Sequence, residues 1–453
     1  MNTLSDRMRP NLAGLDVGVG QVLLWPPVNL LSLLSDLTKR DPHAIIAIDV
    51  DPDRPAHVSR AELWRRTLQL RADLATAGVG RGDAVLVCLP NSSAWLDWHV
   101  AAASLGAHVV GLPPHCEAAE VTQVLQRARP RVAALPHGLP GSRLPELLRE
   151  ATTGGLAPPA VAVVAGPHGE PPVDPSGYDV GGGAWLPSAA TAGMPMPVTS
   201  GDELAVAFAP SLAAHLESSL VRLAVDSARA IGLRHDDVLV CAEPLSSPLG
   251  LGAALAAVAG EATCLFEPTL EAANLLAALS RFAATHLAAG GESVSRLARK
   301  WHDTARPPKA PKSWRWLGVA LDTPDMAEFA HRVEEELGVT VSGLYGSAEV
   351  LSPVALWPPD SAAPRRWSAG GLPVSRDIEV RVVDPDSGRP LPPGETGELR
   401  FRGYCVVDHY LGEQAGPARR VTEDGWLATG ERGALLGHGE FRRDGRIAAA
   451  ARD

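Results

Sequence analysis

Residues 60–114 read RAELWRRTLQLRADLATAGVGRGDAVLVCLPNSSAWLDWHVAAASLGAHVVGLPP, and this stretch decides the fold class. Its first part places apolar residues at helical spacing and stops at Gly78, and a short apolar run bounded by turn residues follows as a buried strand would. The scheme then repeats, with a helical pattern that stops at Gly106 and a strand from His108 to Leu112. Strands that alternate with helices predict a parallel sheet covered by helices.

The same alternation returns further along the chain, from Asp202 to about Gly346. Between the two regions, residues 151–200 are rich in glycine and proline, which favours a long connector. After Gly370 the pattern changes to short strands and turns, which is typical of a small antiparallel or barrel-like module.

The predicted fold class is therefore α/β, with two stacked, helix-covered, mostly parallel sheets and a small β-barrel-like module. The predicted divisions are a first α/β subdomain with its connector (1–200), a second α/β subdomain (201–370), the small β module (371–440) and a short hinge remnant (441–453).

Composition narrows the class of protein. The chain has 453 residues, more than one ordinary core, and a formal net charge of -11, which argues against a general nucleic-acid or anionic-membrane binder. Its five cysteines lie far apart, its N-terminus lacks a signal-peptide pattern, and its most apolar run is interrupted by Glu261. The sequence contains no H-E-x-x-H arrangement, so a zinc site is not expected. A cytoplasmic protein without a membrane span is expected.

Four motifs then occur in a specific order: GVTVSGLYGSAEV (338–350), GETGELRFRGYCVVDHYLG (394–412), EDGWLATGERGAL (423–435) and DGRI (444–447). They resemble the Y-G-x-T-E, G-E-L-x-x-x-G, D-G-W-x-x-T-G-D and G-R-x-K-D motifs of the adenylate-forming (AMP-binding) superfamily. This superfamily includes acyl- and aryl-CoA ligases, peptide-synthetase adenylation domains and luciferases. Residues 57–114 resemble its opening domain, so the match covers nearly the whole chain.

The resemblance implies a chemistry in which a carboxylate and ATP give acyl-AMP and pyrophosphate, and the acyl group then passes to a thiol or amine. It implies that Tyr345 would stack on adenine, that Gly346 and Ser347 would also bind the nucleotide, and that Glu349 would hold magnesium, which also makes Glu349 a catalytic candidate. Glu431 and Arg446 would reach the ribose. The acyl pocket is expected to include Ser247, Gly318, Val319, Ala320, Gly343 and Leu344.

The ligands that the resemblance implies are AMP or an acyl-adenylate, with ATP and magnesium as further candidates. The expected partners are a small-molecule carboxylate, CoA or a carrier protein as acceptor, and a separate chain that supplies the superfamily's C-terminal domain, since the sequence ends where that domain would begin.

The stretch VAFAPSLAAHLESSL (206–220) departs from the superfamily's phosphate loop, T-S-G-T-T-G-x-P-K-G. Aligned without gaps, residues 209–218 contain no glycine, and the lysine position holds Glu217. One charge pair near a protein surface is worth about 4 kcal/mol, so the reversed sign predicts weaker phosphate binding. His215 remains in this stretch as a candidate general base or anion contact, or as a half-exposed bystander.

Other departures agree with this one. The phosphate-binding threonine of Y-G-x-T-E is Ala348, a motif histidine is Ser247, and the charged hinge position is Ala449. Two hypotheses follow. One is a divergent acyl- or aryl-activating protein that is impaired in unaided ATP-dependent adenylation, and the other is a catalytically inactive homologue that acts as a binding or scaffolding partner in a biosynthetic pathway.

Overall fold

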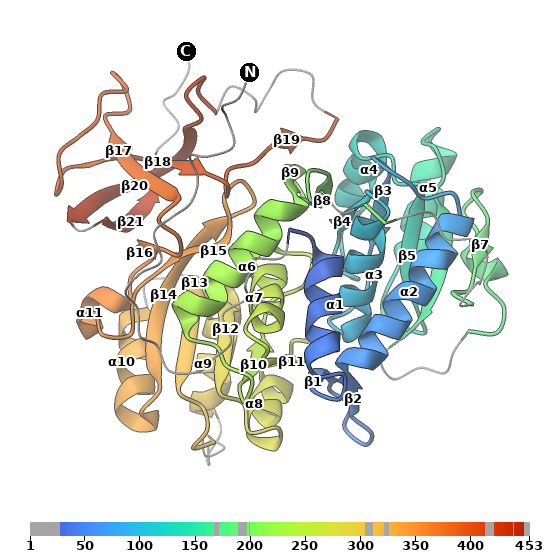
Figure 1. Cartoon of the computed structure of the whole chain (residues 1–453), viewed down its shortest axis with the longest axis horizontal. Coiled ribbons are helices and arrows are strands. Elements are labelled where there is room, and N and C mark those ends of the chain that lie inside the picture. The colour runs from blue at the N-terminus through green and yellow to red at the C-terminus, as the bar shows by residue number, and fades with distance from the viewer. Residues whose placement is uncertain are drawn as a thin grey trace, which may run out of the picture.

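The structure is a computed structural model that describes residues 28–166, 172–188, 197–198, 200–303, 311–320, 326–412, 421–437 and 439–447. Two sheets form its framework (Figure 1). In the described residues the smaller sheet has eight strands, in the spatial order β19 (His409–Tyr410), β9 (Ala213–Leu216), β8 (Leu204–Phe208), β4 (His108–Gly111), β3 (Ala84–Val87), β5 (Val132–His137), β6 (Ala160–Ala165) and β7 (Ala184–Trp185).

The larger sheet has thirteen strands within the described residues. Their spatial order is β17 (Ile378–Val383), β18 (Thr396–Gly403), β20 (Leu427–Gly437), β21 (Glu440–Arg446), β16 (Gly370–Pro373), β15 (Leu351–Leu356), β14 (Thr340–Ser347), β13 (Trp316–Ala320), β12 (His286–Gly290), β10 (Val238–Cys241), β11 (Thr263–Phe266), β1 (Ile45–Asp49) and β2 (Ala56–Ser59). The central strands of both sheets pair in parallel, as the alternation predicts.

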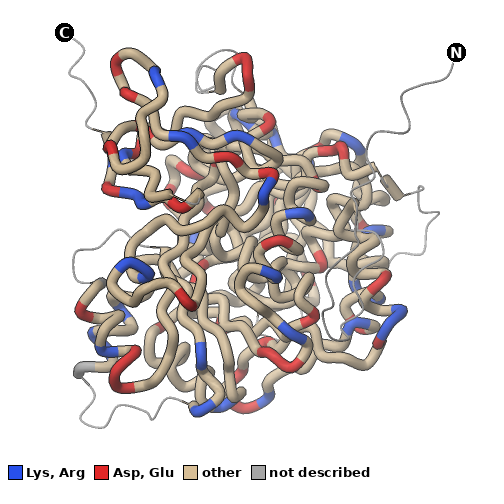
Figure 2. Tube along the Cα trace, turned by 60° about the vertical axis from the view of Figure 1, so that its left-hand side comes forward, with Lys and Arg blue, Asp and Glu red and all other residues tan. Residues whose placement is uncertain are grey.

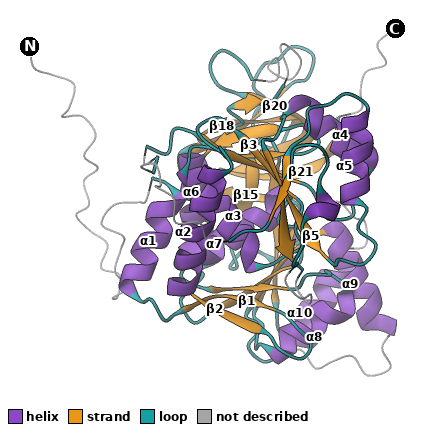
Figure 3. Ribbon diagram, turned by 90° about the vertical axis from the view of Figure 1, so that its right-hand side faces the viewer, coloured by secondary structure: helices purple, strands orange, loops and turns teal. Residues whose placement is uncertain are grey.

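The helices form three layers around the two sheets. They are α1 (Leu30–Arg40), α2 (Arg60–Thr76), α3 (Ser93–Ser104), α4 (Ala118–Arg127), α5 (Leu144–Thr153), α6 (Glu217–Ile231), α7 (Pro248–Ala259), α8 (Ala272–Arg281), α9 (Gly291–Asp303), α10 (Met326–Leu337), α11 (Ala363–Arg366) and a 3-10 turn, η1 (Ser176–Tyr178). Figure 3 shows α1, α2 and α6 on one side of the strands and α4, α5 and α9 on the other.

The middle layer joins the sheets. Helix α3 contacts β1 of the larger sheet and β3, β4 and β8 of the smaller one, and one apolar cluster includes buried residues from both sheets. Helices α8, α9 and α10 cover the outer face of the larger sheet, and α4 and α5 cover the outer face of the smaller one, each over its own cluster. Local signals explain several helix ends: the Ser59 side chain caps α2, and α6 stops at Gly232 with φ of 80°.

The prediction of a β-barrel-like module is wrong in one respect, because the strands do not close into a barrel. Strands β17, β18, β20 and β21 are antiparallel, but β21 pairs with β16, so they extend the larger sheet instead of closing on themselves. Antiparallel strands with short turns are compatible with either arrangement, and sequence alone does not show which edge pairs with a neighbouring element.

Sheet membership does not follow the predicted divisions. Strands β1 and β2 lie in the larger sheet next to β11, whereas β8 and β9 lie in the smaller sheet next to β4. The predicted connector, 151–200, contains the end of α5 together with β6, η1 and β7; its residues 167–171, 189–196 and 199 lie outside the described residues.

Charge is spread over the surface. Figure 2 shows basic and acidic segments interspersed along the described trace. Within the described ranges, every helix is too short or too polar to cross a bilayer.

Candidate functional site

Tyr345, the predicted adenine contact, lies near the end of β14 and is only 3% exposed. The ring of Phe401 stacks on it, with centroids 5.1 Å apart and planes 7° apart, and Phe441 meets it at 89°. One face of the tyrosine is therefore already covered. A base can stack only on the opposite face, and neighbouring side chains must move for it to do so.

A polar network extends from the same tyrosine. Its hydroxyl lies beside Glu431 and Thr429, and burial, followed by the Glu431 carboxylate, raises the pKa of Tyr345 well above its usual value. Glu431 forms an ion pair with Arg443 Nη2 at 3.0 Å. Arg446, its predicted companion at the ribose, is the register partner of Glu431 across β20 and β21 but is exposed. Arg443, in the run RRDGR, was missed because a single arginine among three gives no positional signal.

Glu349 lies in the turn after β14. Ser347 Oγ donates to Glu349 Oε2 at 3.1 Å and accepts from the Glu349 amide, while Val407 N donates to the Glu349 carbonyl at 2.8 Å. The described residues contain no group of three or more His, Cys, Asp or Glu that could hold a metal ion. Magnesium is commonly bound through one or two carboxylates plus substrate phosphates, so Glu349 fits such an ion only when a polyphosphate is also bound.

His215 is fully buried, not half-exposed. Its Nε2 lies 2.6 Å from the Ala348 carbonyl oxygen, which makes Nε2 the protonated nitrogen, and Nδ1 has no hydrogen-bond partner in the described part of the chain. Burial lowers the pKa of His215 to about 4, so the ring is neutral at physiological pH. Its hydrogen bond therefore ties β9 to the turn that contains Glu349.

The stretch aligned with the phosphate loop is a tight hairpin between β8 and β9. Leu212 N donates to the Phe208 carbonyl at 2.7 Å, and Leu212 has a φ of 57°. From α4, Gln123 Nε2 donates to the Pro210 carbonyl at 2.7 Å and Arg127 Nη2 to the Ser211 carbonyl at 3.1 Å. The turn thus directs carbonyl oxygens at fixed donors.

This hairpin corrects the ungapped alignment of residues 209–218 with the phosphate loop. Residues 213–216 form strand β9 and Glu217 begins helix α6, so these residues do not belong to a loop. Glu217 is 1% exposed and accepts a hydrogen bond from Leu30 N at 2.8 Å. Burial raises its pKa to about 7. Its carboxyl group faces the start of α1, so the predicted repulsion of a phosphate by this side chain is not what the structure shows.

Five of the predicted acyl-pocket residues lie on the adjacent strands β13 and β14, where Ala320 is the register partner of Leu344 and Val319 that of Gly343. Ser247 caps α7 by accepting from Gly250 N at 3.0 Å, and a Cβ on Gly318 would lie 2.1 Å from the Trp316 ring. Val319 is buried on the outer face of the larger sheet and Leu344 on its inner face. Gly343 packs against the Ser368 carbonyl and Ala320 is partly buried. Ala449, the predicted hinge position, lies outside the described residues.

A crevice of about 690 Å³ lies where strands of both sheets end. Its walls are the segments after β3, β4, β5, β6, β10 and β11, together with Arg296 of α9. Ligands of open α/β sheets bind outside the carboxyl ends of strands, and pockets of 300–1,000 Å³ are typical for small molecules. We call this space the carboxyl-edge crevice.

Asn91 joins the two sheets at this crevice. Its Nδ2 donates to the Glu243 carbonyl at 2.8 Å, and Leu245 N donates to its Oδ1 at 2.9 Å. These bonds hold the loop after β10 against the loop after β3. Asn91 belongs to the sequence PNSS. Asparagine is also common in turns, so the sequence alone does not reveal that Asn91 bonds to a second loop.

Gly111, the last residue of β4, lets the loop after β10 and helix α3 pack closely against that strand. A Cβ there would lie 2.8 Å from the Cα of Ser246 and 2.8 Å from the Trp95 ring. Because a backbone atom is in the way, Gly111→Ala is expected to lower the free energy of unfolding by about 1–3 kcal/mol in urea titrations. Gly80→Ala, with no atom within 4 Å of its new Cβ, is the control. Equal effects of the two substitutions would contradict this account.

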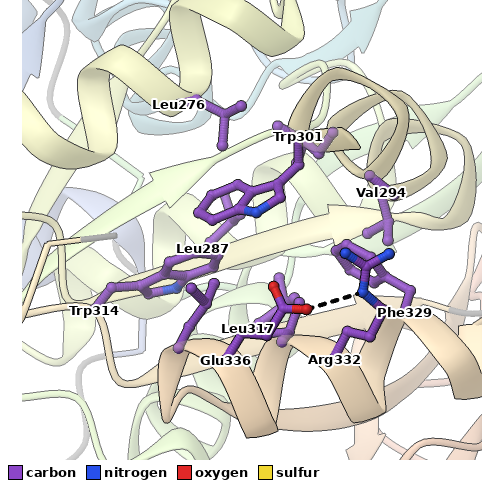
Figure 4. A pocket seen from close by; sticks show the side chains of 13 residues that line it. Leu276, Leu287, Val294, Trp301, Trp314, Leu317, Phe329, Arg332 and Glu336 are labelled. Atoms are coloured by element: carbon purple, nitrogen blue, oxygen red, sulfur yellow. Dashed lines mark hydrogen bonds and ion pairs between the residues drawn. The ribbon is translucent and has the colours of Figure 1, made fainter. Parts of the chain in front are cut away.

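A second pocket lies away from these groups. It is apolar, has a free volume of about 30 Å³, and lies under α8, α9 and α10 near the starts of β12 and β13. Figure 4 shows Trp301 and Trp314 in its walls and the Arg332–Glu336 ion pair, 3.2 Å, beside it. Its small free volume makes it a packing defect of the outer cluster, not a site for substrate.

Comparison with known proteins identifies the family. The family model described as AMP-binding enzyme matches residues 35–169 and 212–411, which is most of the chain. The chain belongs to the AMP-binding enzyme family. The family match omits residues 170–211, so the first three hairpin residues, 209–211, lie outside it.

Relatives of this AMP-binding family member activate acyl or aryl carboxylates. Salicyl-AMP ligase / salicyl-S-ArCP synthetase of Mycobacterium tuberculosis is 29% identical over 442 residues, covering 90% of this chain and 71% of that protein. A long-chain-fatty-acid-CoA ligase from Archaeoglobus fulgidus superposes with a TM-score of 0.78 at 19% identity, covering 96% and 87%. The anthranilate CoA ligase AuaEII, in complex with anthranoyl-AMP, superposes with a TM-score of 0.76 at 20% identity, covering 93% and 79%.

Proposed function

We propose that this AMP-binding family member binds a carboxylate or a preformed acyl-adenylate and does not catalyse unaided ATP-dependent adenylation. The observation that carries the proposal is the hairpin between β8 and β9. A phosphate loop works because successive backbone N–H groups point at the anion, usually with glycines that permit the turns.

Two positions of the hairpin offer no free N–H group to an anion. Pro210 has no N–H group, the Leu212 N–H is bonded to the Phe208 carbonyl, and the carbonyls of Pro210 and Ser211 are held by Gln123 and Arg127. Opening the turn toward a triphosphate would break these bonds, each of which contributes about 0.5–1.5 kcal/mol. Loss of one charge-stabilising group at an active site typically lowers the rate by a factor of about 100–1,000.

The remaining nucleotide contacts support binding of an adenylate without its pyrophosphate. Glu431 and Arg446 are register partners on adjacent strands, so both can reach one ribose. Tyr345 would offer the base the face that Phe401 leaves uncovered. Magnesium would join Glu349 only with a polyphosphate, so a protein that binds acyl-adenylate alone needs no metal there. The acceptor, CoA or a carrier protein, stays a prediction.

A second function, a non-catalytic binding or scaffolding partner in a biosynthetic pathway, is favoured by a different observation. Tyr345 is 3% exposed, and its hydroxyl already engages Glu431, which is itself paired with Arg443. A nucleotide would have to displace parts of this network. If no nucleotide can displace it, the residues around Tyr345 serve only as a core contact between β14, β18 and β21.

Pyrophosphate exchange tests the proposal. With labelled pyrophosphate, ATP, magnesium and a panel of carboxylates that includes salicylate and anthranilate, exchange is expected to stay at the level of the protein-free blank. Protein-dependent exchange with any acid would overturn the proposal.

Thermal unfolding separates the two functions, because a ligand that binds only the folded state raises the melting temperature. Stabilisation by a non-hydrolysable acyl-adenylate or AMP, but not by ATP, is expected for the adenylate-binding protein. No shift with any of the three would favour the scaffolding partner.

A further inference from the structure

We propose that Arg443 is a positioning residue for the adenylate site: it holds the Glu431 carboxylate in the interior and keeps it from pairing with Arg446 at the surface. The inference rests on the proposed function, because the position of Glu431 matters to a ligand only if an adenylate binds there. It assigns a role to a residue just outside the DGRI motif, which begins at Asp444.

Two arginines of β21 lie within reach of the Glu431 carboxylate. Arg446 is its register partner across β20 and β21, and the side chains of directly opposed residues are neighbours. Arg443 is opposed by Gly433, two residues further along β20, and reaches Glu431 diagonally. Between the two pairs β21 contains one extra residue, Asp444, at a shift in register. Such a bulge re-aims side chains, which explains how two arginines of one short strand approach the same carboxylate.

Glu431 pairs with the inner of these two arginines. Its Oε1 lies 3.0 Å from Arg443 Nη2, and the two side chains are 18% and 10% exposed. Arg446 is exposed and forms no ion pair within the described part of the chain. Water and salt screen an exposed ion pair far more than a shielded one, so the inner pair is the stronger of the two. The Arg446 guanidinium is therefore left available to a ligand.

The inner pair fixes where the carboxylate points. The backbone of Glu431 is held by Thr429, whose Oγ1 accepts from the Glu431 amide at 3.0 Å and donates to the Leu399 carbonyl at 2.7 Å. The Tyr345 hydroxyl lies beside Glu431 and Thr429. The ion pair with Arg443 thus keeps the carboxylate next to the ring on which an adenine would stack. A carboxylate has about four lone-pair positions, so one arginine leaves acceptors for two ribose hydroxyls.

The length of the Glu431 side chain explains why a positioning residue is needed. The related motif, D-G-W-x-x-T-G-D, has an aspartate where this chain has Glu431. The extra methylene adds a rotatable bond, so the backbone fixes a glutamate carboxylate less tightly than an aspartate carboxylate. Without Arg443, the carboxylate is expected to rotate toward Arg446, where water screens it and the ribose loses it.

Discrimination between AMP and dideoxy-AMP, which lacks both ribose hydroxyls, tests the inference. In calorimetric titrations of the full chain, AMP is expected to bind at least about tenfold more tightly, as is usual for hydrogen bonds to a charged group. Arg443→Met is expected to reduce this ratio to less than about threefold, the value of a weak hydrogen bond in water. Arg443→Lys should retain most of the ratio, because it keeps the charge.

Arg442→Met is the matched control, because Arg442 is the adjacent residue, is 45% exposed and pairs with Asp444. It should leave the ratio of the two affinities unchanged. If Arg443→Met weakens both nucleotides by the same factor, Arg443 has a structural role only and the inference is wrong. Equal binding of the two nucleotides to the natural protein would contradict it as well.

Crystal structures without nucleotide supply an independent readout. In Arg443→Met, Glu431 is expected to have turned from Tyr345 to Arg446, and a carboxylate that stays beside Tyr345 would overturn the inference. Arg443→Gln serves the same purpose if the methionine variant does not fold. No binding of AMP to the natural protein would overturn this inference together with the ribose contact on which the proposed function draws. Binding of AMP with an unchanged ratio in Arg443→Met would overturn this inference alone.

Discussion

Arg366→Ala is expected to lower the free energy of unfolding by about 3–5 kcal/mol, the usual cost of removing one partner from a buried ion pair. Arg366 is 7% exposed, and its Nη2 lies 2.6 Å from Glu334 Oε1. The same guanidinium donates to the Val341 carbonyl at 2.9 Å and to two carbonyls of the loop before α11. Its loss leaves Glu334 as an uncompensated charge.

The effect should reach the candidate site, because Glu334 also accepts from Val341 N at 2.8 Å at the start of β14, the strand that carries Tyr345. Denaturant unfolding measures it. Arg365→Ala is the matched control, since Arg365 is the exposed neighbour that pairs with Glu440 and stacks on Trp357, and it should cost about 1 kcal/mol or less. Adding Glu334→Gln to Arg366→Ala should recover part of the loss. Similar losses for Arg365→Ala and Arg366→Ala would contradict this role.

The alternation of helices and strands was predictable because it is a local signal. The patterns around Gly78 and Gly106 end α2 and α3 within a few residues of the structural ends, and both glycines have positive φ angles of 81° and 75°. A residue's own neighbours determine where a helix stops, so no distant partner is needed.

Strand β9 was not predictable in the same way. Its sequence, AAHL, has no β-branched residue and was aligned as part of a loop. It is held by β8 on one side and by β19, almost two hundred residues along the chain, on the other. Pairing with a distant strand overrides weak local propensity. The same reason explains why His215 proved buried: the cover comes from the Glu349 turn.

In the candidate site, too, the local features were predictable and the long-range contacts were not. The motifs singled out Tyr345 and Glu431, which lie on strands β14 and β20, and Glu349, which lies in the turn after β14. They did not reveal that Phe401 and Phe441 enclose the tyrosine, because these rings come from β18 and β21 and each reads as an ordinary inward-facing strand residue. The crevice is formed by segments that follow six different strands, so no single motif encodes it.

Glu217→Gln is expected to stabilise the protein at high pH and to leave its stability nearly unchanged at pH 5. Burial raises the pKa of Glu217 to about 7, whereas the unfolded chain has the ordinary value of 4.5. The folded state therefore holds the proton more tightly, and the associated stability is present below pH 4.5 and is lost as the pH rises toward 7. Above pH 8 the penalty amounts to about 3 kcal/mol, an upper figure because the start of α6 favours a carboxylate.

Glutamine removes this penalty because it cannot ionise, yet its amide oxygen still accepts from the Leu30 amide that begins α1. Comparing variant and natural protein at one pH cancels the opposite trend of His99, His108 and His215, whose pKa values burial lowers to about 4. Melting curves at pH 5 and pH 8.5, with exposed Glu292→Gln as the control, give the difference. A stability gain that is the same at both pH values, or a loss at pH 8.5, would mean that the carboxylate at position 217 is charged and stabilised. In that case its ionised form, and not its burial beside α1, would explain why this residue occupies the start of α6.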